Sequence, residues 1–151
     1  MNDELGFQMF RLTNAGYCCS QIMLKLALDA EGKENEDLLR AVNGLCMGAG
    51  SYQKTCGVLT AGIAILGLYV GKGRDDEYPK PGFSEMVDEF TEGFIAEFGS
   101  KECSDIIGVC SVTDYQTNQS FRLKCGDVLM KSYNMLQEIL REHDYEFGSR
   151  D

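Results

Sequence analysis

An uncharged stretch in the middle of the chain constrains the fold more than any other feature. It runs from Cys56 to Val70 and reads CGVLTAGIAILGLYV, with apolar or small side chains on every side of a helical projection. A fully buried strand is the competing interpretation, but the length and the many Ala and Gly residues favour a helix. The stretch is too short to cross a bilayer, which needs about 20 apolar residues. We therefore predict a buried central helix over residues 56–70.

Length, charge and cysteine content limit what such a chain does. With 151 residues, we expect one domain over residues 1–151. The net charge of −10 argues against nucleic acid and anionic membranes as partners, because phosphate groups are bound by clustered Lys and Arg. The acidic N-terminus lacks the apolar core of a signal peptide, so we expect a cytoplasmic protein without membrane insertion. Seven cysteines in a reducing compartment are more often ligands, catalysts or buried small residues than disulfides.

Helical periodicity surrounds the central stretch on both sides. The second predicted helix of the chain, which contains residues 19–30, precedes the central helix. Its apolar positions form one continuous stripe that does not include Cys18. That stripe consists of Cys19, Ile22, Met23, Leu26, Ala27 and Ala30. Because only the second of the two adjacent thiols lies on the stripe, we expect Cys19 and not Cys18 to face the core. Replacing Cys19 by Ser should therefore disturb a thiol site, whereas Cys18→Ser should leave it almost unchanged.

The remaining segments predict further helices joined by polar connections. Asn35 is expected to cap a third helix, which ends in a glycine-rich loop over residues 44–50. Residues 71–82 form an exposed connection, after which Ser84 is expected to cap a fifth helix. The inner face of that helix is predicted to hold Val87, Phe90, Phe94 and Phe98. Residues 108–120 are expected to be irregular and contain Cys110. The inner stripe of the last helix is predicted to hold Cys125, Val128, Leu129, Ser132, Leu136, Ile139 and Leu140. The fold class is therefore all-α, a single-domain antiparallel bundle of about five to six helices.

Up-and-down topology predicts where the cysteines meet. Consecutive helices with short connections run antiparallel, so alternate helix ends lie at the same end of the bundle. Tracing the chain from the second helix places four cysteines at one end, namely Cys19, Cys56, Cys103 and Cys125. Cys46 is also expected near this end, and His143 at the opposite end. Thiols more than a hundred residues apart in the chain are thus predicted to share one site.

The same four cysteines are each expected in the first turn or so of a helix. Unpaired backbone N–H groups and the helix dipole favour negative charge there, which stabilises the thiolate that attacks disulfides and binds metals. A buried cysteine that acts only as a small apolar residue is the alternative at any one position. Since all four share both the position and the end of the bundle, we interpret them as a joint site.

The sequence resembles the C-GCAxxG-C-C family of small redox-active proteins. The resemblance covers nearly the whole chain, and its motifs are GYCCSQ at 16–21, CGVLTAG at 56–62, CSDIIG at 103–108 and KC at 124–125. It places the four family cysteines on Cys19, Cys56, Cys103 and Cys125. The chain departs from the family at Val58, where Ala is favoured, and at Ala61, where Gly is favoured. Cys18, Cys46 and Cys110 are additional thiols. The resemblance implies a redox role without naming a substrate.

Three uses of this thiol set compete. The first is thiol–disulfide exchange, with Cys56 as the nucleophile and Cys19 as the resolving thiol. The second is electron transfer through an iron–sulfur cluster held by the four thiolates. The third is a structural zinc site with the same four ligands, which the absence of paired C-x-x-C motifs makes less favourable. We rank the two redox uses above zinc, and do not separate them from each other. The chain would then be an oxidoreductase, and its partner a redox protein or a small thiol or disulfide.

Other functions are excluded more directly or stay as alternatives. The sequence lacks the C-x-x-C-H motif of c-type haem attachment and the glycine-rich motifs of nucleotide-binding loops. A catalytic Cys–His pair would need His143, which is expected at the wrong end. The non-enzymatic alternative is an acidic binding module whose thiols pack, or hold a metal for a transporter or another partner protein.

Overall fold

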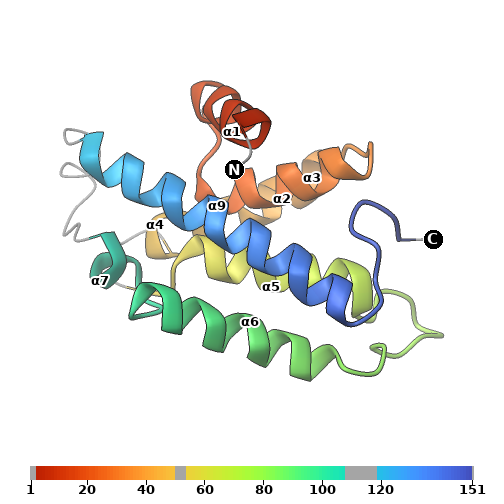
Figure 1. Cartoon of the computed structure of the whole chain (residues 1–151). Coiled ribbons are helices and arrows are strands. Elements are labelled where there is room, and N and C mark those ends of the chain that lie inside the picture. Colours follow the sequence, from red (N-terminus) through yellow and green to blue (C-terminus); the bar gives the residue numbers. More distant parts are fainter. Residues whose placement is uncertain (1–2, 50–53, 108–118, 151) are drawn as a thin grey trace.

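The computed structural model describes residues 3–49, 54–107 and 119–150 and shows the predicted all-α fold (Figure 1). The elements are α1 (Asp3–Asn14), α2 (Cys19–Ala30), α3 (Glu36–Val42), the 3-10 helix η1 (Asn43–Leu45), α4 (Cys46–Ala49), α5 (Gly57–Val70), α6 (Phe83–Phe98), α7 (Cys103–Ile107) and α9 (Gln119–Glu142). Within these described ranges, the β-structure consists of one isolated bridge between Thr55 and Glu102. None of the described helices has the length and apolar character needed to cross a membrane.

Helix α5 is the central helix that its uncharged sequence predicts. Its N-cap is Cys56, it ends at Val70, and it packs against α2, α6 and α9. Contacts on several sides explain why apolar residues surround the helix axis. Gly62 allows the closest of these approaches, because a Cβ at this position would lie 2.4 Å from the Phe90 ring of α6.

Helix α2 is buried over a wider face than its predicted stripe. Ile22, Met23, Leu26 and Ala27 are buried as expected, and Leu24 and Leu28 are buried in addition. The reason is that α2 contacts helices on several sides, namely α1, α3, α5 and α9. Ala30, the last residue of the helix, is exposed, so the predicted stripe was wrong at this end.

Helix α6 begins at a different cap from the predicted one. The N-cap is Gly82, with φ 88°, and Ser84 already lies inside the helix, so the prediction of a serine cap was wrong. A positive φ strains residues with a side chain, which explains why a glycine occupies the cap. The predicted phenylalanine face is confirmed at Phe90 and Phe94, which are fully buried. Phe98 is half-buried and packs edge-on against Phe94.

Two connections contain more helix than their sequences indicated. Asn35 caps α3 as predicted, its side chain accepting a hydrogen bond from Leu38 N at 3.0 Å. The glycine-rich stretch that follows was predicted as a loop, but it forms η1 and α4. At the other end of the chain, α9 already begins at Gln119, so residues 119–120 are helical and not irregular. The rest of the predicted irregular segment, 108–118, lies outside the described residues.

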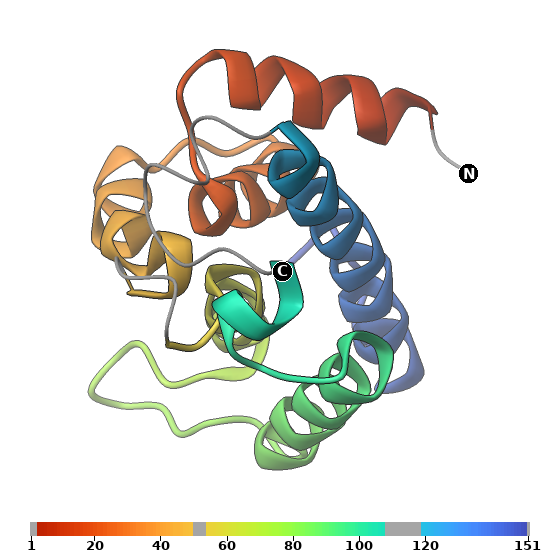
Figure 2. The same cartoon turned by 90° about the vertical axis from the view of Figure 1, so that its left-hand side faces the viewer.

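The helix directions bring particular helix ends together. In Figure 1, α4, α7 and the start of α9 lie at the same end as the start of α5, while α6 begins at the opposite end and runs back toward α7. Figure 2 looks onto this end and shows α7 in front of α5, with α4 beside them. A continuous hydrophobic cluster connects the long helices behind it. The alternating directions predicted from the sequence therefore place the cysteine-bearing helix starts near one another.

Candidate functional site

A short antiparallel pairing holds Cys56 next to Cys103. Thr55 lies opposite Glu102, Cys56 N donates to Lys101 O at 2.8 Å, and Cys103 N donates to Lys54 O at 2.9 Å. Cys56 and Cys103 are therefore diagonal neighbours on the face opposite to Thr55 and Glu102, a position in which Cα atoms lie about 7–8 Å apart. Both cysteines are buried, at 7% and 5% exposure. This pairing connects the start of α5 to the start of α7.

Two glycines let the backbone approach the thiols. A Cβ on Gly57 would lie 2.9 Å from Cys19 Sγ, so the Cys19 sulfur sits directly against the first residue of α5. A Cβ on Gly48 would lie 2.8 Å from Cys103 Cβ and 3.0 Å from Lys54 O, and Gly48 has a φ of 59°. Both positions lack room for a side chain. At Gly48 the glycine-rich stretch therefore lies close to the backbone at Lys54.

The thiols affect one another's pKa through their charges. Burial raises the pKa of the Cys56 thiol from 9.0 to about 12, with a further increase from the negative charge of a Cys19 thiolate. Burial also raises the pKa of Cys103, and so do thiolate charges at Cys56, Cys125 and Cys19. Negative charges close together in a buried site disfavour one another, so each ionised thiol makes the next ionisation harder.

The predicted effect of the helix starts is reversed by burial at two of these positions. Backbone N–H groups of Val58 and Leu59 do lower the pKa of Cys56, as expected at a helix N-terminus, but burial outweighs them. The expectation of a stabilised thiolate was therefore wrong for Cys56 and for Cys103. Cys125 also lies deeper in its helix than expected, in the second turn of α9, because that helix begins at Gln119.

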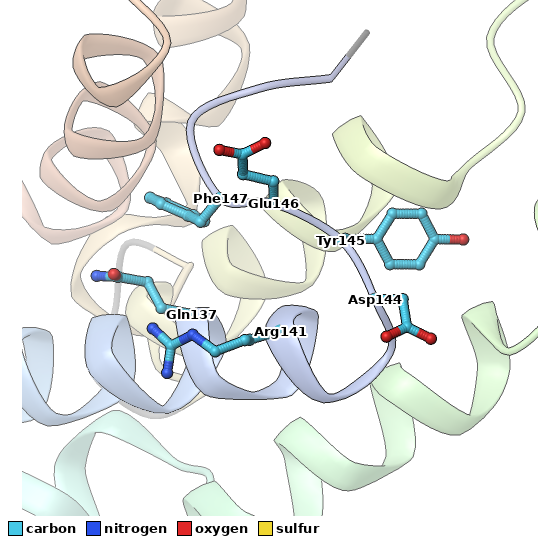
Figure 3. A pocket seen from close by; sticks show the side chains of 6 residues that line it. All are labelled: Gln137, Arg141, Asp144, Tyr145, Glu146 and Phe147. Atoms are coloured by element: carbon cyan, nitrogen blue, oxygen red, sulfur yellow. The ribbon is translucent and has the colours of Figure 1, made fainter.

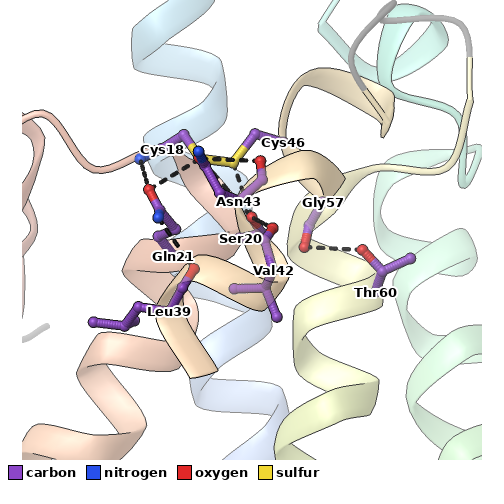
Figure 4. The surroundings of a disulfide bond; sticks show 9 residues. All are labelled: Cys18, Ser20, Gln21, Leu39, Val42, Asn43, Cys46, Gly57 and Thr60. Carbon is purple, nitrogen blue, oxygen red and sulfur yellow. Dashed lines mark hydrogen bonds between the residues drawn. A yellow bond between two sulfur atoms is a disulfide. The ribbon is translucent and has the colours of Figure 1, made fainter. Parts of the chain in front are cut away.

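The structure contains a disulfide that the sequence did not predict. Cys18 and Cys46 form it, with their Cα atoms 6.0 Å apart and a sequence separation of 28 (Figure 4). By the chain-entropy estimate, closing a loop of this length stabilises the fold by about 3–4 kcal/mol. Cys18 is the N-cap of α2 and half-exposed, whereas Cys46 is buried at the start of α4. The apolar stripes of the helices could not indicate this pair. Both cysteines lie at helix ends, where the stripe does not predict the direction of a side chain.

In the part of the chain that the structure describes, no three His, Cys, Asp or Glu side chains are arranged so that they could hold a metal ion. Cys110 lies outside the described residues. His143 lies at the far end of the bundle as predicted, just after α9, and its Nε2 is 2.9 Å from Glu89 Oε1.

A pocket near that far end contains none of the cysteines. It is lined by Gln137 and Arg141 of α9 and by residues 144–147 of the segment that follows (Figure 3). Since its lining is remote from every described thiol, it does not extend the candidate site. The chemistry that the sequence indicated is concentrated at the opposite end of the bundle.

Comparisons with known proteins identify a family for the chain. No curated protein and no solved structure matches the chain. One protein family matches it over residues 17–139, and the description of that family reads "Putative redox-active protein (C_GCAxxG_C_C)". The matched region begins beside the first cysteines and includes α2, α5, α7 and most of α9. The chain therefore belongs to the C-GCAxxG-C-C family.

Proposed function

We propose that the chain is a thiol–disulfide redox protein whose site consists of Cys19, Cys56, Cys103 and Cys125. The observation that carries this proposal is the meeting of separate helix starts: the Thr55–Glu102 pairing holds two of the thiols, and a third lies against Gly57. Membership of a redox-active family supports the same chemistry. Neighbouring thiols can give up two electrons together by forming a disulfide, which a single thiol cannot do alone.

The raised pKa of Cys56 changes the roles within the site. With a pKa of about 12, roughly one Cys56 thiol in 100,000 is ionised at pH 7, so this residue is a poor attacking group. Cys19 is half-buried and lies at the edge of the cluster, nearer to an incoming molecule. We therefore assign the attack to Cys19 and the resolving step to Cys56, the reverse of the order proposed from the sequence.

In this reaction the substrate disulfide accepts two electrons. The Cys19 thiolate attacks one substrate sulfur, and the other sulfur leaves with a proton. Cys56 then attacks Cys19 Sγ, releases the second substrate thiol, and leaves a Cys19–Cys56 disulfide in the protein. The partner is a small disulfide or a redox protein, and the proposed compartment is the cytoplasm.

Disulfide mapping after controlled oxidation tests this proposal. The reduced protein is exposed anaerobically to graded amounts of the thiol oxidant diamide, alkylated, and mapped by mass spectrometry. We expect a disulfide within the set Cys19, Cys56, Cys103 and Cys125, and its loss in Cys19→Ser. Cys18→Ser is the matched control at the neighbouring position and should retain it. If the four cysteines stay alkylated as thiols under all oxidant ratios, the proposal is wrong.

A metal centre is the second candidate, and one observation favours it. The thiolate charges raise each other's pKa, and a bound cation would relieve that repulsion. An iron–sulfur cluster for electron transfer or a structural zinc ion would both use the same four thiolates. Because the described side chains are not arranged to hold a metal ion, binding would require the cysteines to move. Anaerobic purification followed by metal analysis distinguishes these outcomes: iron in a brown protein supports a cluster, and one zinc per colourless chain supports a structural or non-enzymatic role.

A further inference from the structure

Cys19 lies between the disulfide and the other thiols. A Cβ on Gly57 would be 2.9 Å from Cys19 Sγ and 3.3 Å from Cys46 Cα, so the Cys19 sulfur and the Cys46 Cα are at most about 6 Å apart. Cys56 is the residue before Gly57, and a Cys19 thiolate raises its pKa. Cys19 is also joined directly to Cys18, the other half of the disulfide. The Cys19 sulfur therefore lies next to both the Cys18–Cys46 disulfide and Cys56.

We infer that the Cys18–Cys46 disulfide is a second redox site, which exchanges electrons with the buried thiols through Cys19. The inference deepens the proposed function and rests on it, because it requires Cys19 and Cys56 to form a disulfide. In its first step, the Cys19 thiolate attacks Cys46 Sγ, the Cys18–Cys46 bond breaks, and Cys18 leaves as a thiolate that takes up a proton. A Cys19–Cys46 disulfide is the intermediate.

The second step passes the oxidation into the thiol cluster. Cys56 attacks Cys19 Sγ and gives its proton to Cys46, which leaves as a thiol. The products are a Cys19–Cys56 disulfide and two thiols at Cys18 and Cys46. Two electrons have moved from the inner pair, Cys19 and Cys56, to the outer pair, Cys18 and Cys46. No outside oxidant is needed, and the reverse order of steps returns the electrons.

The surroundings of the outer pair accommodate both redox states. Cys18 is the N-cap of the twelve-residue helix α2, a position that favours the thiolate leaving in the first step. Its sulfur lies 3.4 Å from Gln21 Oε1 and 3.4 Å from Asn43 Oδ1, so the reduced thiol has acceptors within reach (Figure 4). At Cys46, the buried Ser20 hydroxyl lies 2.8 Å from the sulfur and can form a hydrogen bond with it.

Exposure decides which pair meets an outside substrate. Cys18 is half-exposed, while Cys56 and Cys103 are buried. A small disulfide therefore reaches Cys18 more readily than Cys56 and Cys103. The outer pair would act as the exit through which electrons reach an outside disulfide, and the inner cysteines would supply those electrons.

The first experiment looks for the intermediate. Cys56→Ser removes the resolving thiol, so the Cys19–Cys46 disulfide should accumulate and be found by alkylation and peptide mapping. Wild-type protein that carries only the Cys18–Cys46 disulfide is mapped at successive times and should convert in part to Cys19–Cys56. This second measurement needs no variant and stands even if Cys56→Ser does not fold. Absence of every Cys19-containing disulfide from both samples overturns the inference.

The second experiment measures the transfer of electrons from the protein to an outside disulfide. The fully reduced chain and its C18S/C46S variant are compared in the rate at which each reduces glutathione disulfide, with helical circular dichroism as the check on folding. We expect at least a tenfold lower rate in the variant, and equal rates overturn the inference. Diamide, given in excess, should still form the inner disulfide in the variant. If that disulfide forms but the rates are equal, only the proposed exchange between the outer pair and Cys19 is wrong. If it never forms, the proposed function fails as well.

Discussion

The buried Cys56 thiol predicts how the stability of the fold changes in alkaline solution. Its pKa is about 12 in the folded chain and 9.0 in the ordinary reference state, because only 7% of the residue is exposed. Below pH 9 the thiol is protonated in both states, and its contribution to stability is complete. Between pH 9 and about 12 the unfolded chain has lost this proton and the folded chain still binds it, so stability falls as the pH rises.

The size of the effect follows from the same shift. A one-unit difference in pH across this window lowers the free energy of unfolding by about 1.4 kcal/mol for one thiol. From pH 9 to pH 11 the loss through Cys56 approaches about 2.7 kcal/mol, which is a large share of the stability of a typical domain.

Urea unfolding followed by circular dichroism measures this loss. The experiment compares wild-type protein with Cys56→Ala at pH 8, 9, 10 and 11 under anaerobic conditions. Tyr133 and Tyr69 also have raised pKa values through burial, but they are present in both proteins and cancel in the difference. The wild type should lose stability more steeply than the variant above pH 9. Parallel curves for the two proteins would refute the argument that burial holds the Cys56 proton.

Three further predictions concern packing around the site. Gly57→Ala should lower the free energy of unfolding by about 1–3 kcal/mol and disturb the thiol cluster, because its Cβ would meet backbone and sulfur; Gly67→Ala in the same helix has open space and should be harmless in the same urea titration. Phe94→Ala should cost about 3–5 kcal/mol in thermal unfolding, since this ring is fully buried. Ser20→Ala should cost about 1–3 kcal/mol by urea titration, because it leaves the buried Val42 carbonyl without the hydroxyl that donates to it at 2.7 Å.

Periodicity explains which parts of the fold were predictable. The uncharged stretch became α5 because a helix without a polar face is stable only when other helices surround it. The stripe of α9 from Val128 to Leu140 is buried as predicted, since one side of that long helix faces the core. Antiparallel connections then place the cysteine-bearing helix starts at one end, although they are distant in sequence.

The details of the site depend on contacts that periodicity does not describe. The pairing of Thr55 with Glu102 involves main-chain groups just outside two helices, and no side-chain pattern indicates it. Cys18 was placed away from the core because it lies off the stripe of α2. As the cap of that helix, however, it lies within disulfide distance of Cys46, whose segment was expected to be a loop.

The thiol pKa values show why a correct local argument gave the wrong sign. A helix N-terminus stabilises a nearby negative charge by about 0.3–1 kcal/mol, which lowers a pKa by less than one unit. The rise in the pKa of Cys56 from 9.0 to about 12 corresponds to about 4 kcal/mol in the opposite direction. Burial therefore exceeds the helix effect several-fold, and burial depends on how α2, α5 and α7 meet.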